Sequence, residues 1–426
     1  MKVRYFSPGL ALVALIAAAN AGCGDDDSSP RPAGETQEAT STAGAGHTPL
    51  VTSTLPPPLA SPTGQPRRHT VALPELGTLP TEVVRSSSVL PSLQGWASDD
   101  EIGASPVAAF GDRFVIQRMY LKRPAGHPVS YELWDPTSKQ TQPLWTVPAG
   151  KLNEFSAADG AWLITVETGY SLPLPKWSLV LHNLDSGEVR TVATSDDRIP
   201  SLAQNVQLGP AGFAPLPAIG GGRTAWVEFY VTTSGHLGKR LQIYDIGRNQ
   251  IETIDSVEDA SQGDLESPSM GGQDLAWLRR ERAEPALIQV RGLSTGLIDS
   301  YEIGGDPYSA SLSEDGSFLV WDDTQYAQRG TRAKYALLRA SGAVTRYSES
   351  KGWGTYVGGK RVSWTPWEND AGFYDMVEGV LYRLDLQGAK TVYATVMGSW
   401  YVWQETRDTG EGREQSEATY YFLKLQ

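Results

Sequence analysis

Charged residues recur at one position of a repeated sequence pattern, two residues after a site that is usually tryptophan. Because side chains alternate along a strand, the two positions point the same way. In a cyclic fold these charges would form a ring on one face, and its net negative field would favour a divalent ion, a basic peptide or an amino sugar. The alternative is that the charges only mark where each strand meets water. The ring comprises Arg118, Glu167, Glu228, Arg279, Asp323 and Glu405, with Pro366 at the seventh position.

Beyond these charges, the sequence contains no motif that identifies a reaction. No two histidines have the spacing of a metal site such as H-E-x-x-H, and there is no G-x-S-x-G elbow, phosphate-binding loop or dinucleotide fingerprint. The acidic run at 25–27 is better explained as a solvated stretch than as a metal site. We therefore expect no cofactor, and no metal site formed by these histidines or by the acidic run. The histidines are His47, His69, His127, His182 and His236.

The elements that must position the ring are read from the same repeat. A glycine is followed five residues later by a closing residue, and this unit recurs at intervals of about 40 to 60 residues, which is typical of propeller blades. We predict that the repeated tryptophans fill the space between neighbouring units and are not ligand platforms, because each large aromatic buries a wide surface. The closing residues are Ile116, Thr165, Trp226, Trp277, Trp321, Trp364 and Trp403.

Each unit continues with an apolar strand, a tight turn and a further strand. Glycine and asparagine suit these turns because they tolerate positive φ. Together with the strand before the glycine and the tryptophan strand, this makes four short antiparallel strands per unit. The sequence therefore predicts an all-β, seven-bladed β-propeller of four-stranded antiparallel blades. The expected turn residues are Lys139, Gly187, Asn249, Gly296, Gly342 and Gly388.

The ends of the repeat array also carry predictions. The last unit stops at Gln426 without an outermost strand. An unpaired strand edge can pair with another chain and cause aggregation. We expect the segment at about 80–95, before the first blade, to supply that strand. An insertion at 194–219 should join one blade's outer strand to the next blade's inner strand and cover part of the ring's face.

The N-terminus has the sequence features of an export signal. Basic Lys2 and Arg4 are followed by a ten-residue apolar run at 10–19 and then by small residues. Asn20-Ala21-Gly22-Cys23 resembles a bacterial lipobox, although Asn20 stands where an aliphatic residue is usual. That resemblance implies acylation of Cys23, the only cysteine; the alternative is an ordinary cleaved signal. We expect a signal peptide at 1–22, a lipidated, disordered Ser/Thr/Pro-rich tether at 23–68 and the propeller at 69–426.

Two stretches carry a family resemblance. The segment LSEDGSFLVW at 312–321 is similar to the S-P-D-G element of TolB-type propeller repeats, and LHNLDSGEVRTV at 181–192 resembles their hairpin. The resemblance covers most of 96–426 and implies a propeller located in the cell envelope. It implies no particular partner, because this repeat type serves scaffolds, lyases and peptidase appendages alike.

These observations leave three function classes open. The first is a monomeric envelope lipoprotein, in either membrane, whose propeller binds a protein or a glycan on the ring face. The second is a propeller enzyme, a polysaccharide lyase or glycoside hydrolase, that uses carboxylates on that face. The third is a purely structural surface protein. A net charge of −13 gives no electrostatic footprint for nucleic acid.

Overall fold

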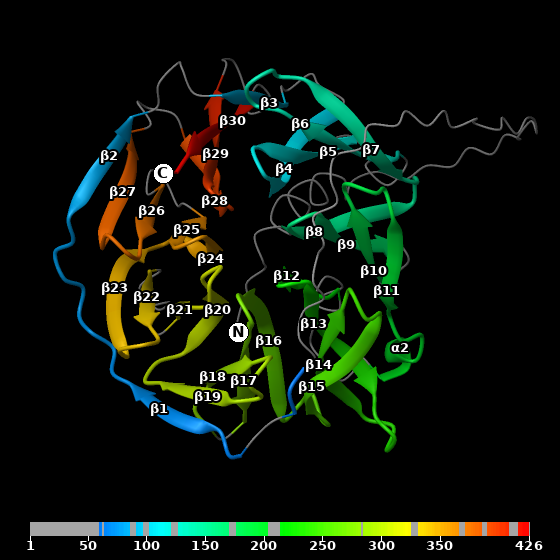
Figure 1. Ribbon diagram of the computed structural model, residues 1–426, viewed down its shortest axis with the longest axis vertical. Coiled ribbons are helices and arrows are strands. Elements are labelled where there is room, and N and C mark those ends of the chain that lie inside the picture. Colours follow the sequence, from blue (N-terminus) through cyan, green and yellow to red (C-terminus); the bar gives the residue numbers. More distant parts are fainter. Residues whose placement is uncertain are drawn as a thin grey trace, which may run out of the picture.

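The protein is described from a computed structural model of the chain. The described residues are 59–61, 64–85, 91–96, 102–120, 127–169, 176–202, 214–282, 284–324, 331–365, 371–385, 390–408 and 416–425. They form seven sheets, each with a four-stranded antiparallel blade, arranged around one axis (Figure 1). The predicted all-β, seven-bladed propeller is thereby confirmed. Cys23 and His47 lie outside the described residues.

The strands follow the chain from blade to blade, each blade running from its innermost to its outermost strand. Blades one to three are β4 (Ile102–Phe110), β5 (Arg113–Tyr120), β6 (Val129–Trp134), β7 (Thr141–Val147); β8 (Lys151–Asp159), β9 (Trp162–Gly169), β10 (Trp177–Asn183), β11 (Val189–Thr194); and β12 (Ala218–Gly220), β13 (Arg223–Val231), β14 (Leu237–Asp245), β15 (Gln250–Val257). Blades four to six are β16 (Gly263–Gly271), β17 (Asp274–Glu281), β18 (Leu287–Gly292), β19 (Ile298–Ile303); β20 (Pro307–Leu312), β21 (Phe318–Asp323), β22 (Arg332–Leu338), β23 (Ala343–Ser350); and β24 (Trp353–Gly358), β25 (Arg361–Thr365), β26 (Gly372–Asp375), β27 (Val380–Asp385). Blade seven consists of β28 (Lys390–Met397), β29 (Trp400–Asp408), β30 (Ser416–Lys424) and, from the other end of the chain, β3 (Ser92–Trp96).

The repeated tryptophans lie on the second strand of their blades and are almost fully buried, between 0 and 1 % exposed. They pack between blades: Trp321 of blade five sits in a cluster with Leu278 and Ile288 of blade four. A sheet with two apolar faces needs such neighbours on both sides. Their predicted structural role is therefore confirmed for all five.

The predicted turn residues explain how each hairpin reverses. Lys139, Gly187, Asn249, Gly296 and Gly342 all have positive φ, the backbone conformation that tight hairpin turns require. In blade six the expected turn at Gly388 is wrong, because the hairpin between β26 and β27 turns at Gly379, which has φ +71°. Residue 388 instead falls between the outer strand β27 and the next inner strand β28, outside the described residues.

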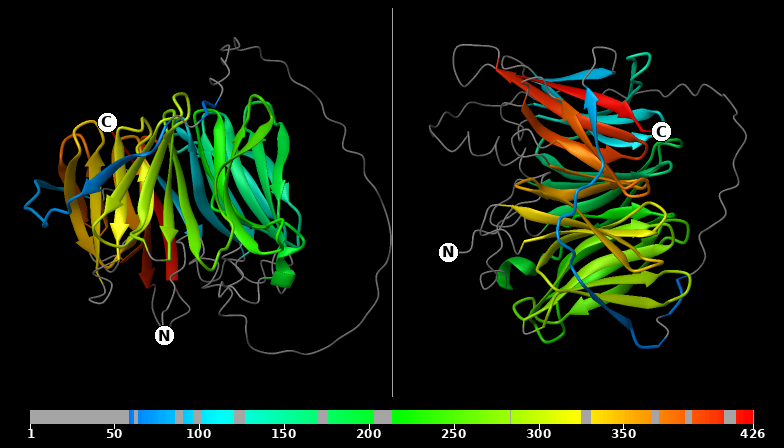
Figure 2. Two further views of the ribbon diagram at one scale, coloured as in Figure 1. Left: turned by 90° about the horizontal axis from the view of Figure 1, so that it is seen from below. Right: turned by 90° about the vertical axis from the view of Figure 1, so that its left-hand side faces the viewer.

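An N-terminal strap, described at residues 59–61, 64–85 and 91–96, runs along the outside of the ring (Figures 1 and 2). Its strand β1 (Arg67–Val71) pairs in parallel with β19 of blade four, and β2 (Thr81–Arg85) pairs in parallel with β27 of blade six. Only β3 closes blade seven, antiparallel to β30. The range expected for closure, about 80–95, thus holds two strands with different partners, and β1 begins two residues inside the expected tether.

The insertion at 194–219 connects the outer strand β11 to the inner strand β12, as predicted. It contains α2 (Ile199–Leu202), and Ile199 packs against Phe229 and Leu237 of blade three. Residues 203–213 lie outside the described part of the chain. Within the described part, no helix is both long and apolar enough to cross a bilayer.

Candidate functional site

Two faces of the ring can be distinguished by where the second strand of each blade begins and ends. We call the end where these strands finish the exit face, and the end where the glycine turns precede them the turn face. All six predicted ring residues lie near the ends of second strands, so they share the exit face. They do not line the axis, because the innermost strands of their blades lie between them and it: β4, β8, β12, β16, β20 and β28.

Two of the ring carboxylates bind the tryptophan of their own repeat. The indole Nε1 of Trp226 donates a hydrogen bond to Glu228 Oε2 at 2.8 Å, and Trp403 Nε1 donates to Glu405 Oε1 at 3.0 Å. Both glutamates are buried. A buried indole N–H needs an acceptor, so these two residues have a structural task.

The other ring charges also have local partners. Arg118 pairs with Glu132 at 2.8 Å, and Glu167 pairs with Lys151 at 2.8 Å. Arg279 reaches Asp255 on the outer strand of the preceding blade, and Trp277 donates to the same aspartate at 2.9 Å. Each of these three ring charges is thus paired with an opposite charge within the fold, and a ligand role for the ring stays a prediction.

Asp323 is the most deeply buried of the ring residues. Its side chain is fully buried at the end of β21, and its Oδ1 accepts a 3.4 Å hydrogen bond from the backbone N–H of Asp306. Asp323 therefore ties the start of β20 to the end of β21 on the exit face.

A second group of charges on the exit face includes two residues of an innermost strand. We call it the exit-face cluster: Lys239, Asp264, Glu266, Arg280 and Asp306. It draws on three consecutive blades. Lys239 Nζ of blade three pairs with Asp264 on the innermost strand of blade four. Arg280 Nη1 bonds Asp306 at 2.6 Å in the segment that leads into blade five, and Arg280 Nε lies 3.8 Å from Glu266.

Glu266 is the most perturbed carboxyl group of this cluster. Loss of solvent raises its pKa to about 7, and the neighbouring charge of Asp264 adds to the rise. Lys239 and Arg280 oppose the shift. The side chain is still 36 % exposed, so it remains open to a ligand. A partly exposed carboxyl group with a pKa near neutral pH is a candidate for ligand binding or for acid–base catalysis.

The sequence analysis missed this cluster, although a signal was available. Asp264 and Glu266 are spaced i, i+2 at the start of an innermost strand, so both side chains fall on one face of that strand. The analysis followed only second strands. The contributions of Lys239 and Asp306 could not be predicted, since they depend on contacts between blades.

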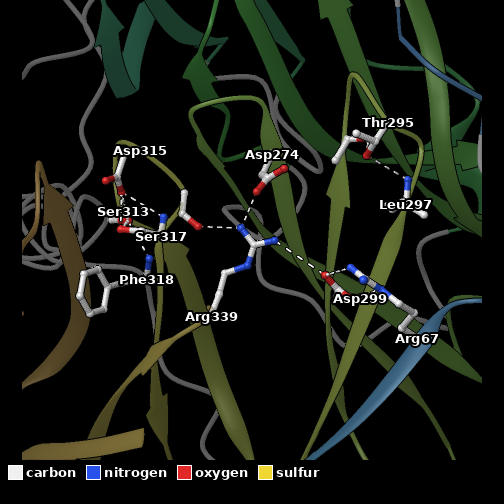
Figure 3. A network of polar contacts seen from close by, with 12 residues as sticks. Arg67, Asp274, Thr295, Leu297, Asp299, Ser313, Asp315, Ser317, Phe318 and Arg339 are labelled. Carbon is white, nitrogen blue, oxygen red and sulfur yellow. Dashed lines mark hydrogen bonds and ion pairs between the residues drawn. The ribbon is translucent and has the colours of Figure 1, made fainter. Parts of the chain in front are cut away.

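The turn face carries a different network, which links blades structurally (Figure 3). Arg339 of blade five donates to Gly316 O at 2.6 Å and pairs with Asp274 of blade four. Asp299 accepts a 2.9 Å hydrogen bond from Arg67 of the strap and lies 3.9 Å from Arg339.

Glycine turns add further links between blades on this face. The N–H of Gly272 donates to Glu314 O at 2.5 Å, and the N–H of Glu314 donates to Gly359 O at 3.1 Å. These polar groups are satisfied by the fold itself.

The described histidines are scattered over the molecule. His69 stacks on Tyr301, His127 stacks on Tyr120, and His236 lies in the hairpin between β13 and β14. His182 is buried against Trp145, with ring centroids 4.0 Å apart. Among the described residues no three His, Cys, Asp or Glu side chains are grouped so that they could hold a metal ion.

Comparisons with known proteins place the fold but not the family. No family model matches the chain, and no curated protein sequence matches it. An oligogalacturonate lyase in complex with manganese is similar in structure, with a TM-score of 0.51, 12 % identity and coverage of 81 % of this chain and 96 % of that chain.

Two further structures match at similar identity. A prolyl endopeptidase gives a TM-score of 0.51 at 12 % identity over 77 % of this chain and 50 % of that chain. An oligogalacturonate lyase from Vibrio parahaemolyticus gives a TM-score of 0.49 at 10 % identity over 82 % and 98 %. At these identities the likeness shows the propeller fold alone.

Proposed function

We propose that this protein is an exported, membrane-anchored TolB-type propeller of the bacterial cell envelope that binds a protein or glycan partner on its exit face. The exit-face cluster is the observation that carries the binding role. Its charges come from three blades, and Glu266, Arg280 and Asp306 are 36, 28 and 59 % exposed. Binding surfaces on a rigid scaffold are commonly built in this way, from strand ends and the loops that follow them.

The anchor belongs to the same proposal and is tested at Cys23. The variant Cys23→Ser should leave the protein unprocessed or release it from the membrane fraction, because multiple acyl chains are needed for stable anchoring. The measurement is membrane fractionation followed by mass spectrometry of the N-terminal peptide. A Cys23→Ser protein that is correctly cleaved and still needs detergent for release would exclude acylation at this residue.

The binding role is tested by capture from detergent-solubilised envelope with the full chain. Glu266→Gln combined with Asp306→Asn should reduce recovery of a partner that the unaltered protein captures. The matched control is Asp112→Asn on the turn face, an exposed carboxylate that pairs with Lys424 at 2.8 Å. Equal capture by the cluster variant, or equal loss in the control, would count against the exit face.

A second candidate function is a propeller enzyme, a polysaccharide lyase or glycoside hydrolase. The observation that favours it is the raised pKa of Glu266, since a carboxyl group with a pKa near 7 can act as a general acid or base. Structurally similar proteins include an oligogalacturonate lyase. Release of new reducing ends or unsaturated products from acidic polysaccharides, lost in Glu266→Gln, would favour the enzyme over the binding module.

A further inference from the structure

A polar crevice lies at the outer rim of blade four, where the N-terminal strap joins the sheet. It has a volume of ≈ 570 Å³, within the range of sites for small molecules. Its walls come from two parts of the chain that are more than 200 residues apart. The lining residues are Gln65, Pro66, Arg68, Leu287, Gln289 and Ser300.

The polar groups of this crevice form a row across three adjacent strands. Arg68 of β1 is opposite Ser300 of β19, and Ser300 is opposite Gln289 of β18. Residues that are opposite one another in neighbouring strands present their side chains on the same face of the sheet. A guanidinium, a hydroxyl and an amide are therefore placed side by side, and Leu287 supplies an apolar surface next to them.

Arg68 differs from its neighbours in having a charge that the fold does not use. Arg67 and His69, on the other face of β1, both contact Asp299. Within the described part of the chain, the Arg68 side chain makes no hydrogen bond or ion pair, and it is exposed. Two other arginines on this face of blade four already form ion pairs. Arg279 pairs with Asp255, and Arg291 pairs with Glu252 at 3.5 Å.

We propose that this rim crevice binds a hydroxylated carboxylate of monosaccharide size, that is, a sugar acid. The Arg68 guanidinium would hold the carboxylate, since its planar fork matches two carboxylate oxygens. Gln65, Gln289 and Ser300 would serve the hydroxyl groups, because amides and hydroxyls both donate and accept. Leu287 and Pro66 would cover the C–H face of the sugar ring.

Titration of the full chain in detergent with glucuronate, by saturation-transfer difference NMR, tests this site. Glucuronate should saturate one site, whereas glucose and acetate should bind more weakly. Arg68→Gln should weaken glucuronate binding by roughly ten- to a hundredfold, the effect of losing a charge-assisted hydrogen bond. Gln289→Ala should weaken it less and should narrow the difference between glucuronate and acetate.

The matched control is Arg67→Gln, which removes the same charge from the neighbouring residue on the opposite face of the strap. It should leave glucuronate affinity within about twofold, a change too small to represent a direct contact. Glu266→Gln, the variant that tests the exit face, should also leave it unchanged, so the two sites fail or succeed separately.

Four outcomes would overturn the assignment. These are no saturable glucuronate binding, unchanged affinity in Arg68→Gln, equal loss in Arg67→Gln, or acetate binding as tightly as glucuronate. The third would mean that strap docking and not contact with Arg68 matters. The last would mean that the crevice holds any small anion.

Discussion

The indole of Trp226 and the carboxylate of Glu228, two residues apart on one strand, are joined by a buried hydrogen bond of 2.8 Å. Glu228 also pairs with Arg240 at 2.6 Å. The position of Glu228 in the repeat, which suggests a place in a ligand ring, is therefore explained by its role as the acceptor for a buried indole N–H. The same relationship recurs at Trp403 and Glu405, so the spacing W-x-E marks an indole with its acceptor.

Glu228→Ala should destabilise the protein by about 2–3 kcal/mol, because it leaves the Trp226 N–H buried without an acceptor and frees Arg240. Glu228→Gln keeps an acceptor and should cost less. The measurement is urea denaturation followed by tryptophan fluorescence and circular dichroism. If Glu228→Ala were as stable as the unaltered protein but had lost its partner, the ring would be a binding surface after all.

Trp321→Ala should cost about 3–5 kcal/mol of unfolding free energy, the range for truncating a buried aromatic. Trp321 is fully buried and stacks on Tyr335 at 5.4 Å. A lowered melting temperature measured by calorimetry is the expected result. Trp321→Phe, which retains most of the apolar volume, should lose clearly less and serves as the control.

Much of the fold could be predicted from the sequence, because blades are built from local signals. The positive-φ turn at Gly316 and the tryptophan at 321 sit at fixed distances within one unit, and an equivalent unit repeats. The failure at blade six has the same origin: Val380–Asp385 is an outer strand, and the sequence pattern of a strand, a glycine and a strand at 380–393 spans two blades.

What could not be predicted depends on contacts between distant segments. The strands β1 and β2 add to the edges of blades four and six in parallel, and nothing in RRHTV or TEVVR identifies those edges. The exit-face cluster is similar, since Arg280 meets Asp306 only because two blades are adjacent. Single-strand periodicity specifies which side chains share a face, and it does not specify which foreign side chain lies opposite.

Stability should fall between pH 6.5 and 4 partly because of His182. Burial lowers the pKa of this histidine from 6.5 to about 4 in the folded protein. The residue is only 4 % exposed. In that window the unfolded chain binds the proton and the folded chain does not, so stability is full above pH 6.5 and declines as the pH falls. The loss due to this group should reach about 2 kcal/mol at pH 5.

The measurement is the free energy of unfolding at pH 7 and pH 5 for the unaltered protein and for His182→Gln. Glutamine does not titrate, so the variant should start less stable at pH 7 and lose less on acidification. Equal losses of stability for the two proteins would mean that burial does not lower the pKa of His182 in the folded protein.

Two truncations should separate the roles of the strap. A chain that begins at residue 87 lacks β1 and β2 but keeps β3, whereas a chain that begins at residue 98 also lacks β3. The second should aggregate or unfold, because the outer edge of β30 is then unpaired and the ring is not closed. The first should stay monomeric and folded by size-exclusion chromatography, with a lower melting temperature. Equal behaviour of the two chains would contradict the assignment of closure to β3.

The docking of the strap start depends on Gly296, whose absent Cβ makes room for Ser61. A Cβ built at Gly296 would overlap the carbonyl oxygen of Ser61, beside the 2.8 Å hydrogen bond from Ala60 N to Leu293 O. Gly296→Ala should therefore displace this end of the strap and open it to limited proteolysis. Gly342→Ala is a close control, because Gly342 has φ +72° against +70° at Gly296 and no atom within 4 Å of its Cβ position. Both variants carry the strain of alanine at positive φ, about 1 kcal/mol, so only Gly296→Ala should increase cleavage between residues 59 and 66. Equal cleavage in the two variants would mean that the backbone strain, and not the contact with Ser61, controls the strap.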